Sequence, residues 1–287
     1  MSGDAGAAVP TVDVLGVPIA ALDRGQVVEQ VGAWVAAGER RYVCVCPAHS
    51  LTDGVWSPEH RAALRGADLN TADGVPVVWA LRLLGHPAAS RVYGPDLMLD
   101  LLAAAERAGW RVAFYGGRPE RLAPLLEAAA RRFPGLTVAF AESPPFRPLR
   151  PAEDAALVER LGRARPDLVW VGLGAPKQER WMARHVGRVP GVLLGVGAAF
   201  DQLAGAAPRA PKPLQNMGLE WAFRLLREPR RLGWRYARAN PTYAALVGAQ
   251  VVSRLLRGAP LRPRVHDRSD PATLGVSSPA PRSVERS

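Results

Sequence analysis

The stretch Asp167 to Glu179 reads Asp-Leu-Val-Trp-Val-Gly-Leu-Gly-Ala-Pro-Lys-Gln-Glu. Its apolar run predicts a buried strand over Asp167–Val171, and the glycines and proline that follow predict a tight turn. A helical pattern comes next, over Gln178–Val186, and then a second apolar run over Val192–Val196. Strands that are apolar on both faces and alternate with helices are typical of parallel βαβ units.

The same alternation recurs towards the N-terminus. Further apolar runs lie at Tyr42–Cys46, Arg111–Tyr115 and Leu136–Phe140. Helical patterns lie at Leu97–Ala108, Arg118–Phe133 and Ala152–Ala164. The sequence therefore predicts an α/β fold with a Rossmann-like, mostly parallel sheet and helices on both faces.

Composition narrows the class of protein. The chain has 287 residues, of which 48% are hydrophobic and 22% charged, as in globular proteins and unlike disordered or collagen-like chains. No apolar run reaches the roughly 18 residues that span a bilayer, and the first ten residues do not resemble a secretory signal. Cys44 and Cys46 lie in one apolar run, so we interpret both as core residues in a reducing compartment. These features predict a cytoplasmic protein.

Positive charge gathers near the C-terminus. Between Arg209 and Arg264 twelve basic residues face only Glu220 and Glu228, so this segment holds nearly all of the net charge of +11. Tryptophan and leucine alternate with the arginines, which suits an interfacial helix on anionic lipid. A phosphate-rich ligand, a nucleic acid or a merely solvated face would also fit this pattern.

In parallel sheets the ligand lies beyond the carboxyl ends of the strands. The residues there include two truncated glycine fingerprints, Gly172-x-Gly174 and Gly195-x-Gly197, each without its third glycine. An NAD-dependent oxidoreductase is therefore a weaker alternative. The chain also lacks a Gly-Lys-Ser/Thr phosphate loop and an Asp-x-Asp pair. We predict no cofactor and no metal.

Two acidic residues and one amide are candidates for chemistry. Asp73 precedes Gly74 and an apolar helix, so it is either a helix N-cap or a general base for an acceptor hydroxyl. Asp96 has the same two interpretations. Gln178 lies where a strand passes into a helix, and its amide could contact a sugar or a base.

Several sequence blocks together resemble a known family. They are Asp73-Gly-Val-Pro-Val-Val-Trp, Gly94-Pro-Asp-Leu-Met, Phe114-Tyr-Gly-Gly, Gly172-Leu-Gly-Ala-Pro-Lys-Gln-Glu, Gly197-Ala-Ala-Phe-Asp, Ala207-Pro-Arg-Ala-Pro and the block from Gly218 to Arg231. In this order and spacing, from about Val12 to Val247, they are similar to the WecG/TagA/CpsF glycosyltransferases (family 26).

The resemblance implies an inverting, metal-independent hexosyltransferase. Such an enzyme moves an N-acetylmannosamine-type sugar, a hexuronic acid or a hexose from a UDP-sugar to a polyprenyl-diphosphate-linked saccharide. The reaction belongs to cell-surface polysaccharide synthesis, at the inner face of the cell membrane. The donor sugar, the acceptor lipid and the oligomeric state, monomer or homo-oligomer, are left open.

The resemblance also implies roles for residues. Asp73 matches the proposed base, Gln178 a pocket residue, and Arg224 and Arg231 arginines that reach the donor diphosphate. With the residues that follow the strands, the predicted substrate-binding set is His49, Gly94, Asp96, Gly116, Gly117, Gly174, Lys177, Gln178, Asp201, Arg209, Arg224 and Arg231.

The chain departs from the family pattern at two places. Pro47 stands near the position where the family usually has Asn, and a proline side chain cannot hydrogen-bond a sugar. His49 or Ser50 could substitute for it. Before Tyr236, one arginine of an expected basic pair is replaced by Trp234.

The resulting domain prediction has four parts. They are a mobile N-terminus (1–10), an α/β catalytic domain (11–205), a basic membrane-associating appendage (206–258) and a disordered tail (259–287). The expected partners are the donor, the lipid-linked acceptor and an anionic membrane surface at residues 219–258. A nucleic-acid-binding module is the other alternative, but it would leave Asp73 and Gln178 without a task, so no nucleic acid is predicted.

Overall fold

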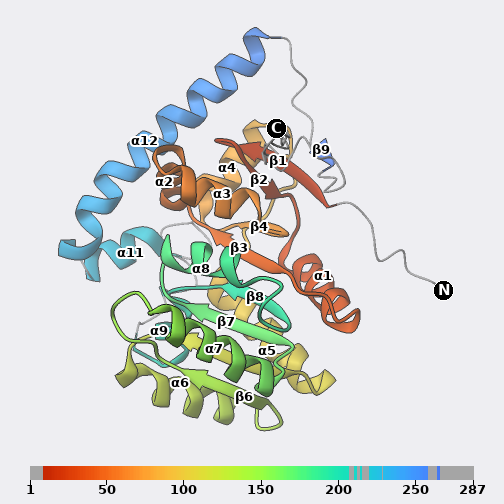
Figure 1. The fold of residues 1–287 in the computed structure, drawn as a ribbon. Coiled ribbons are helices and arrows are strands. Elements are labelled where there is room, and N and C mark those ends of the chain that lie inside the picture. The colour runs from red at the N-terminus through yellow and green to blue at the C-terminus, as the bar shows by residue number, and fades with distance from the viewer. Residues whose placement is uncertain are drawn as a thin grey trace, which may run out of the picture.

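A parallel sheet forms the centre of the molecule (Figure 1). The computed structural model describes residues 9–206, 210–211, 214, 220–227, 229–257 and 264–265. Six strands pair in the order β4-β3-β8-β7-β5-β6, and every pairing is parallel. Their bounds are β3 Tyr42–Cys46, β4 Leu69–Ala72, β5 Arg111–Gly116, β6 Thr137–Glu142, β7 Leu168–Gly172 and β8 Val192–Gly195. The predicted α/β fold is confirmed.

Helices cover both faces of this sheet, as predicted. Residues alternate along each strand, so that Tyr42 and Cys44 join one core while Val43 and Val45 join the other. The first face is covered by α2 Ala48–Trp56, α3 Pro58–Arg65, α7 Pro151–Ala164, α8 Lys177–His185 and α12 Pro229–Leu256. The second is covered by α1 Arg24–Ala36, α5 Gly94–Ala108, α6 Pro119–Arg132 and α9 Ala199–Leu203. Helix α4 Val75–Leu83 also packs on the first core, through Val77 and Leu81, and α11 Glu220–Arg227 is a further helix.

The sequence analysis missed strand β4, because Leu-Asn-Thr-Ala has no apolar run. Asn70 and Thr71 are nevertheless buried. The Asn70 amide donates to the carbonyl oxygens of Leu64 at 2.8 Å and Pro18 at 3.0 Å, which offsets the cost of its burial. β4 is the edge strand that delivers Asp73 to the end of the sheet.

A small antiparallel sheet stands beside the central one. β1 Pro10–Val14 and β2 Val17–Ala20 form a hairpin that was not predicted, and its turn at Leu15 and Gly16 has positive φ at both residues. β9 Arg264–Val265, from the segment predicted as a tail, pairs with β1.

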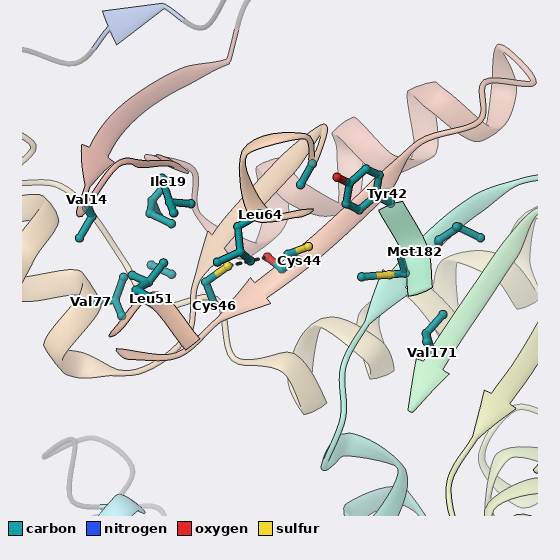
Figure 2. Packing of buried hydrophobic residues seen from close by; sticks show 14 of the residues in the cluster. Val14, Ile19, Tyr42, Cys44, Cys46, Leu51, Leu64, Val77, Val171 and Met182 are labelled. Carbon is teal, nitrogen blue, oxygen red and sulfur yellow. Dashed lines mark hydrogen bonds between the residues drawn. The ribbon is translucent and has the colours of Figure 1, made fainter. Parts of the chain in front are cut away.

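The two cysteines belong to the core on one face of the sheet (Figure 2). Both are free and buried, and the Cys46 thiol lies 3.6 Å from the Cys44 carbonyl oxygen. Burial raises the pKa of both thiols well above its ordinary value. Their interpretation as core residues is confirmed.

Helix α12 packs against α2 and approaches α4. Tyr243 and Val247 enter the core. The Gln250 amide donates to the Asp13 carbonyl oxygen at 2.8 Å and accepts from the Leu15 N–H at 3.0 Å, which attaches the helix to the β1–β2 turn. Among the described residues, no helix combines the length and hydropathy needed to cross a bilayer.

Candidate active site

A cavity of about 1600 Å³ opens at the carboxyl ends of the six strands of the central sheet. It is lined by residues that follow β3, β4, β5, β6, β7 and β8, and by one side of α12. Eight predicted site residues line it, namely His49, Asp73, Gly94, Gly117, Gly174, Lys177, Gln178 and Asp201. The sheet thus brings together side chains that lie far apart in the sequence.

Asp73 lies directly after β4, where its N–H donates to the Cys46 carbonyl oxygen at 3.1 Å. The N-cap of the following helix α4 is Gly74, at φ +99°, and no side chain caps that helix. The interpretation of Asp73 as the N-cap of α4 is therefore wrong. Its carboxylate, partly exposed, lines the cavity.

Arg91 was missed by the sequence analysis. The Val92 N–H donates to the Ala72 carbonyl oxygen at 2.9 Å, which places Arg91 beside the end of β4. Its guanidinium lies 3.5 Å from the Asp73 carboxylate and stacks 4.1 Å from the centroid of the Tyr93 ring. The only sequence signal was its position shortly before the Gly94-Pro-Asp block.

Gln178 and Glu179 form a buried polar pair at the start of α8. The Gly174 N–H donates to Gln178 Oε1 at 3.1 Å, and Gln178 Nε2 donates to Glu179 Oε1 at 2.9 Å. A Cβ at Gly195 would lie 2.6 Å from Met182 Cε and 3.2 Å from Gln178 Nε2, so the missing side chain at Gly195 leaves room for both side chains beside β8. Gln178 retains one N–H and one lone pair for a ligand.

Glu179 is the more deeply buried of the two, at 1% exposure. Its Oε2 has no hydrogen-bond partner among the described residues. Burial raises the pKa of Glu179 to about 7, against the lowering effect of its hydrogen bonds. A carboxyl of this kind titrates near neutral pH.

Gly116 ends β5 at φ +126°, and it does not line the cavity. A Cβ there would lie 2.5 Å from the Gly172 carbonyl carbon, and the Gly117 N–H donates to the Gly172 carbonyl oxygen at 2.9 Å. Gly172 in turn lies under the Phe200 ring. Because Gly116 has no side chain, the ends of β5 and β7 approach each other closely beside the cavity.

Cations outnumber acids along the cavity. The basic side chains are Arg91, Arg118, Arg147, Lys177, Arg180, Arg184 and Arg188, and the acidic ones are Glu59, Asp73, Asp154 and Asp201. Among the described residues, Arg118 and Lys177 form no ion pair with a carboxylate. They lie at the starts of helices α6 and α8, whose N-termini favour anions.

A second group of polar residues reaches the cavity from α7 and α8. His185 Nε2 lies 2.8 Å from Asp154 Oδ1, and its Nδ1 lies 2.7 Å from the Trp181 carbonyl oxygen. Arg188 approaches Asp154 to 3.0 Å. Burial acts to raise the pKa of Asp154, but hydrogen bonds and charge from His185 and Arg188 lower it overall.

Asp96 is not part of the cavity lining. Asp96 lies in the first turn of α5, where the helix dipole favours an acidic residue, and its carboxylate pairs with Arg24 of α1 at 3.0 Å. Arg209 lies outside the described residues. Arg224 and Arg231 lie in α11 and α12, but their side chains are outside what the structure describes.

Pro47 occupies the N-cap position of α2. Pro47 and the half-buried His49 both line the cavity. Ser50 does not line it, because Ser50 is fully buried and its hydroxyl lies 2.9 Å from His60 Nε2. Of the two side chains that could substitute for the family's Asn, only His49 reaches the cavity. No group of three or more His, Cys, Asp or Glu side chains within the described part of the chain could hold a metal ion.

Comparison with known proteins agrees with this geometry. The model of the family described as "Glycosyl transferase WecG/TagA/CpsF family" matches residues 12–257. The chain is 34% identical over 196 residues to the N-acetylglucosaminyldiphosphoundecaprenol N-acetyl-beta-D-mannosaminyltransferase of Bacillus spizizenii, and the matched stretch covers 68% of this chain and 74% of the relative. The chain therefore belongs to the WecG/TagA/CpsF family and is a glycosyltransferase.

Proposed function

We propose that the protein transfers a sugar from a UDP-sugar to a hydroxyl of a polyprenyl-diphosphate-linked saccharide, with inversion and without a metal. The observation that carries this proposal is the Asp73 carboxylate, held beside Arg91 in a cation-rich cavity at the ends of the strands. The activity of the Bacillus relative supports a lipid-linked acceptor and an N-acetylmannosamine-type donor.

The proposed reaction is a single displacement. Asp73 accepts the proton of the acceptor hydroxyl while the hydroxyl oxygen forms a bond to the anomeric carbon. The bond from that carbon to the diphosphate oxygen breaks, and its electron pair leaves with UDP. Attack opposite to the leaving group inverts the anomeric configuration.

Charge on the departing UDP needs stabilisation. Arg118 and Lys177 line the cavity at helix N-termini and form no ion pair with a described carboxylate, which makes them suited to a diphosphate. Arg209, Arg224 and Arg231 are proposed to add to this set when the donor binds. Gln178 is proposed to contact a sugar hydroxyl with its remaining N–H or lone pair.

The segment 206–258 is proposed to attach the protein to the inner face of the membrane. Leu226 of α11 and Leu255 and Leu256 of α12 are exposed, and Arg227, Arg254 and Arg257 lie near them in the sequence. Exposed apolar side chains close to basic ones, on α11 and at the end of α12, suit an anionic bilayer surface. Vesicles with phosphatidylglycerol should sediment the protein more strongly than neutral vesicles, and salt should weaken the difference.

The decisive experiment is a transfer assay with a panel of UDP-sugars, a polyprenyl-diphosphate-linked N-acetylglucosamine acceptor and EDTA. Transfer from one UDP-sugar in EDTA, with inverted anomeric configuration in the product, is the expected result. Activity that disappears with EDTA and returns with Mg²⁺ would contradict the metal-free part. Retention of configuration would contradict the single displacement.

A further inference from the structure

The cavity continues past Asp73 into a groove between α4 and α12, here called the α4–α12 groove. It is lined by Val75, Trp79 and Leu83 of α4 and by Ala244, Val247 and Gly248 of α12. None of these six residues is charged, whereas arginines and carboxylates line other parts of the same cavity. The cavity is therefore polar around Asp73 and apolar along this groove.

Large side chains of α4 share the groove with small ones of α12. Trp79 and Leu83 lie one turn apart on α4, and Ala244 and Gly248 lie one turn apart on α12. A Cβ at Gly248 would meet no atom within 4 Å, so the space beside it is open. From Val75 to Leu83 the groove follows α4 for about 12 Å.

Trp79 and Leu83 are each 59% exposed. Two large apolar side chains on one helix face, in contact with solvent and within a cavity, form a surface that an apolar ligand would cover. The groove begins at Val75, two residues after Asp73, so such a ligand would be continuous with one bound at the carboxylate.

Tyr243 is a second, independent indication that a ligand enters this part of the cavity. It lines the cavity from α12 and is 3% exposed, yet its hydroxyl has no hydrogen-bond partner among the described residues. A buried hydroxyl without a partner is unfavourable until a ligand oxygen or a water reaches it. Burial also raises the pKa of Tyr243, so the hydroxyl stays protonated and can donate.

We propose that the α4–α12 groove binds the polyprenyl chain of the acceptor. The acceptor is an amphiphile, and its two parts match the charge pattern of the cavity: its sugar lies at Asp73, and its hydrocarbon chain leaves past Trp79 towards Leu83. This inference rests on the proposed function, in which the acceptor carries such a chain, and it assigns the chain a site on the protein in addition to the bilayer.

Binding of farnesyl diphosphate, a short polyprenyl diphosphate, tests the groove without turnover. Tryptophan emission should shift to shorter wavelength as the chain covers Trp79 in the full-length protein. The shift should shrink strongly in Trp79→Phe and persist in Trp56→Phe, because Trp56 is 70% exposed but does not line the cavity. Trp181 also lines the cavity but is only 6% exposed, so a shift of wild-type size in Trp79→Phe would overturn the proposal.

Gly248→Leu should fill the groove, and leucine is a better helix former than glycine, so the fold should tolerate it. We expect at least roughly tenfold weaker farnesyl diphosphate binding, with unchanged binding of UDP and inorganic pyrophosphate. Ala249→Leu is the matched control, because Ala249 is exposed on the same helix and does not line the cavity. Farnesyl diphosphate binding of wild-type affinity in Gly248→Leu would overturn the proposal.

Transfer assays separate this inference from the proposed function. If Gly248→Leu transfers sugar to the polyprenyl acceptor with the wild-type KM, the α4–α12 groove is not the polyprenyl site, while the proposed function is supported. If the wild-type protein binds farnesyl diphosphate but transfers nothing from any UDP-sugar, and Gly248→Leu abolishes farnesyl diphosphate binding, the polyprenyl site is supported while the proposed function is wrong.

Discussion

The Arg91 guanidinium lies 3.5 Å from the Asp73 carboxylate and is stacked on the ring of Tyr93. Asp73 follows β4 directly, and Arg91 comes from the loop after α4, which returns to the same strand end through the Val92–Ala72 hydrogen bond. The cation thus holds the carboxylate in place at the wall of the cavity that both residues line.

Asp73→Asn removes the proposed base and keeps the shape of the side chain. We expect kcat to fall by about 10²- to 10⁴-fold, because an amide cannot accept the hydroxyl proton. UDP affinity, measured by calorimetry, should be unchanged. Asp100→Asn is the control, since Asp100 pairs with Arg24 on the surface of α5. Normal turnover by Asp73→Asn would show that Asp73 is not the base.

Arg91→Gln removes the cation that positions Asp73. An interaction with a charged group contributes about 1.5–3 kcal/mol to the positioning of its partner, here the proposed base, so loss of Arg91 should lower kcat by about 10- to 100-fold. Arg91→Lys should recover part of this loss, because lysine keeps the charge but not the planar stack on Tyr93. A purely structural role would lower the melting temperature of both variants and leave kcat per folded molecule unchanged.

Glu179 should make stability depend on pH. Its pKa is about 7 in the folded protein against an ordinary value of 4.5. Well below pH 4.5 the carboxyl is protonated in both states; as the pH rises towards 7 it ionises in the unfolded state first, so the free energy of unfolding falls by about 3 kcal/mol. Glu179→Gln removes this loss.

The comparison for Glu179 is urea unfolding at about pH 4.5 and about pH 8, on either side of the folded-state pKa. The wild-type midpoint should fall between these pH values more than that of Glu179→Gln. The exposed Glu29→Gln variant should behave as the wild type. Equal pH dependence in the wild type and Glu179→Gln would contradict the raised pKa.

Gly116→Ala should be strongly destabilising. The new Cβ would lie 2.5 Å from the Gly172 backbone, at a positive φ that alanine rarely adopts. We expect a loss of about 2–5 kcal/mol in unfolding free energy. Gly109→Ala, also at positive φ but with no atom within 4 Å of its Cβ, should cost only about 1–2 kcal/mol. Equal losses would show that the contact with Gly172 is unimportant.

The sequence alone determined five of the six strands of the central sheet and the end of the sheet at which the cavity opens. Apolar runs such as Leu168–Val171 repeat between helical patterns, and burial on both faces leaves parallel pairing as their natural arrangement. In the structure, Leu168 and Trp170 are buried in one core, and Val169 and Val171 in the other. The glycines after these runs, and the family blocks around Asp73 and Gln178, predicted where the cavity lies. These signals are local, because side-chain periodicity and turn chemistry act over a few residues.

Only the tertiary structure decided which candidates share the cavity. Asp96 matched a family block as well as Asp73 did, but packing of α1 against α5 pairs it with Arg24. The Ser50 hydroxyl contacts His60 and is not part of the cavity lining. Arg91 pairs with Asp73, although no sequence motif marked Arg91 as a site residue. The α4–α12 groove joins residues of two helices that lie far apart in the sequence. Such contacts depend on how loops return and helices pack, and residue spacing along the chain does not encode them locally.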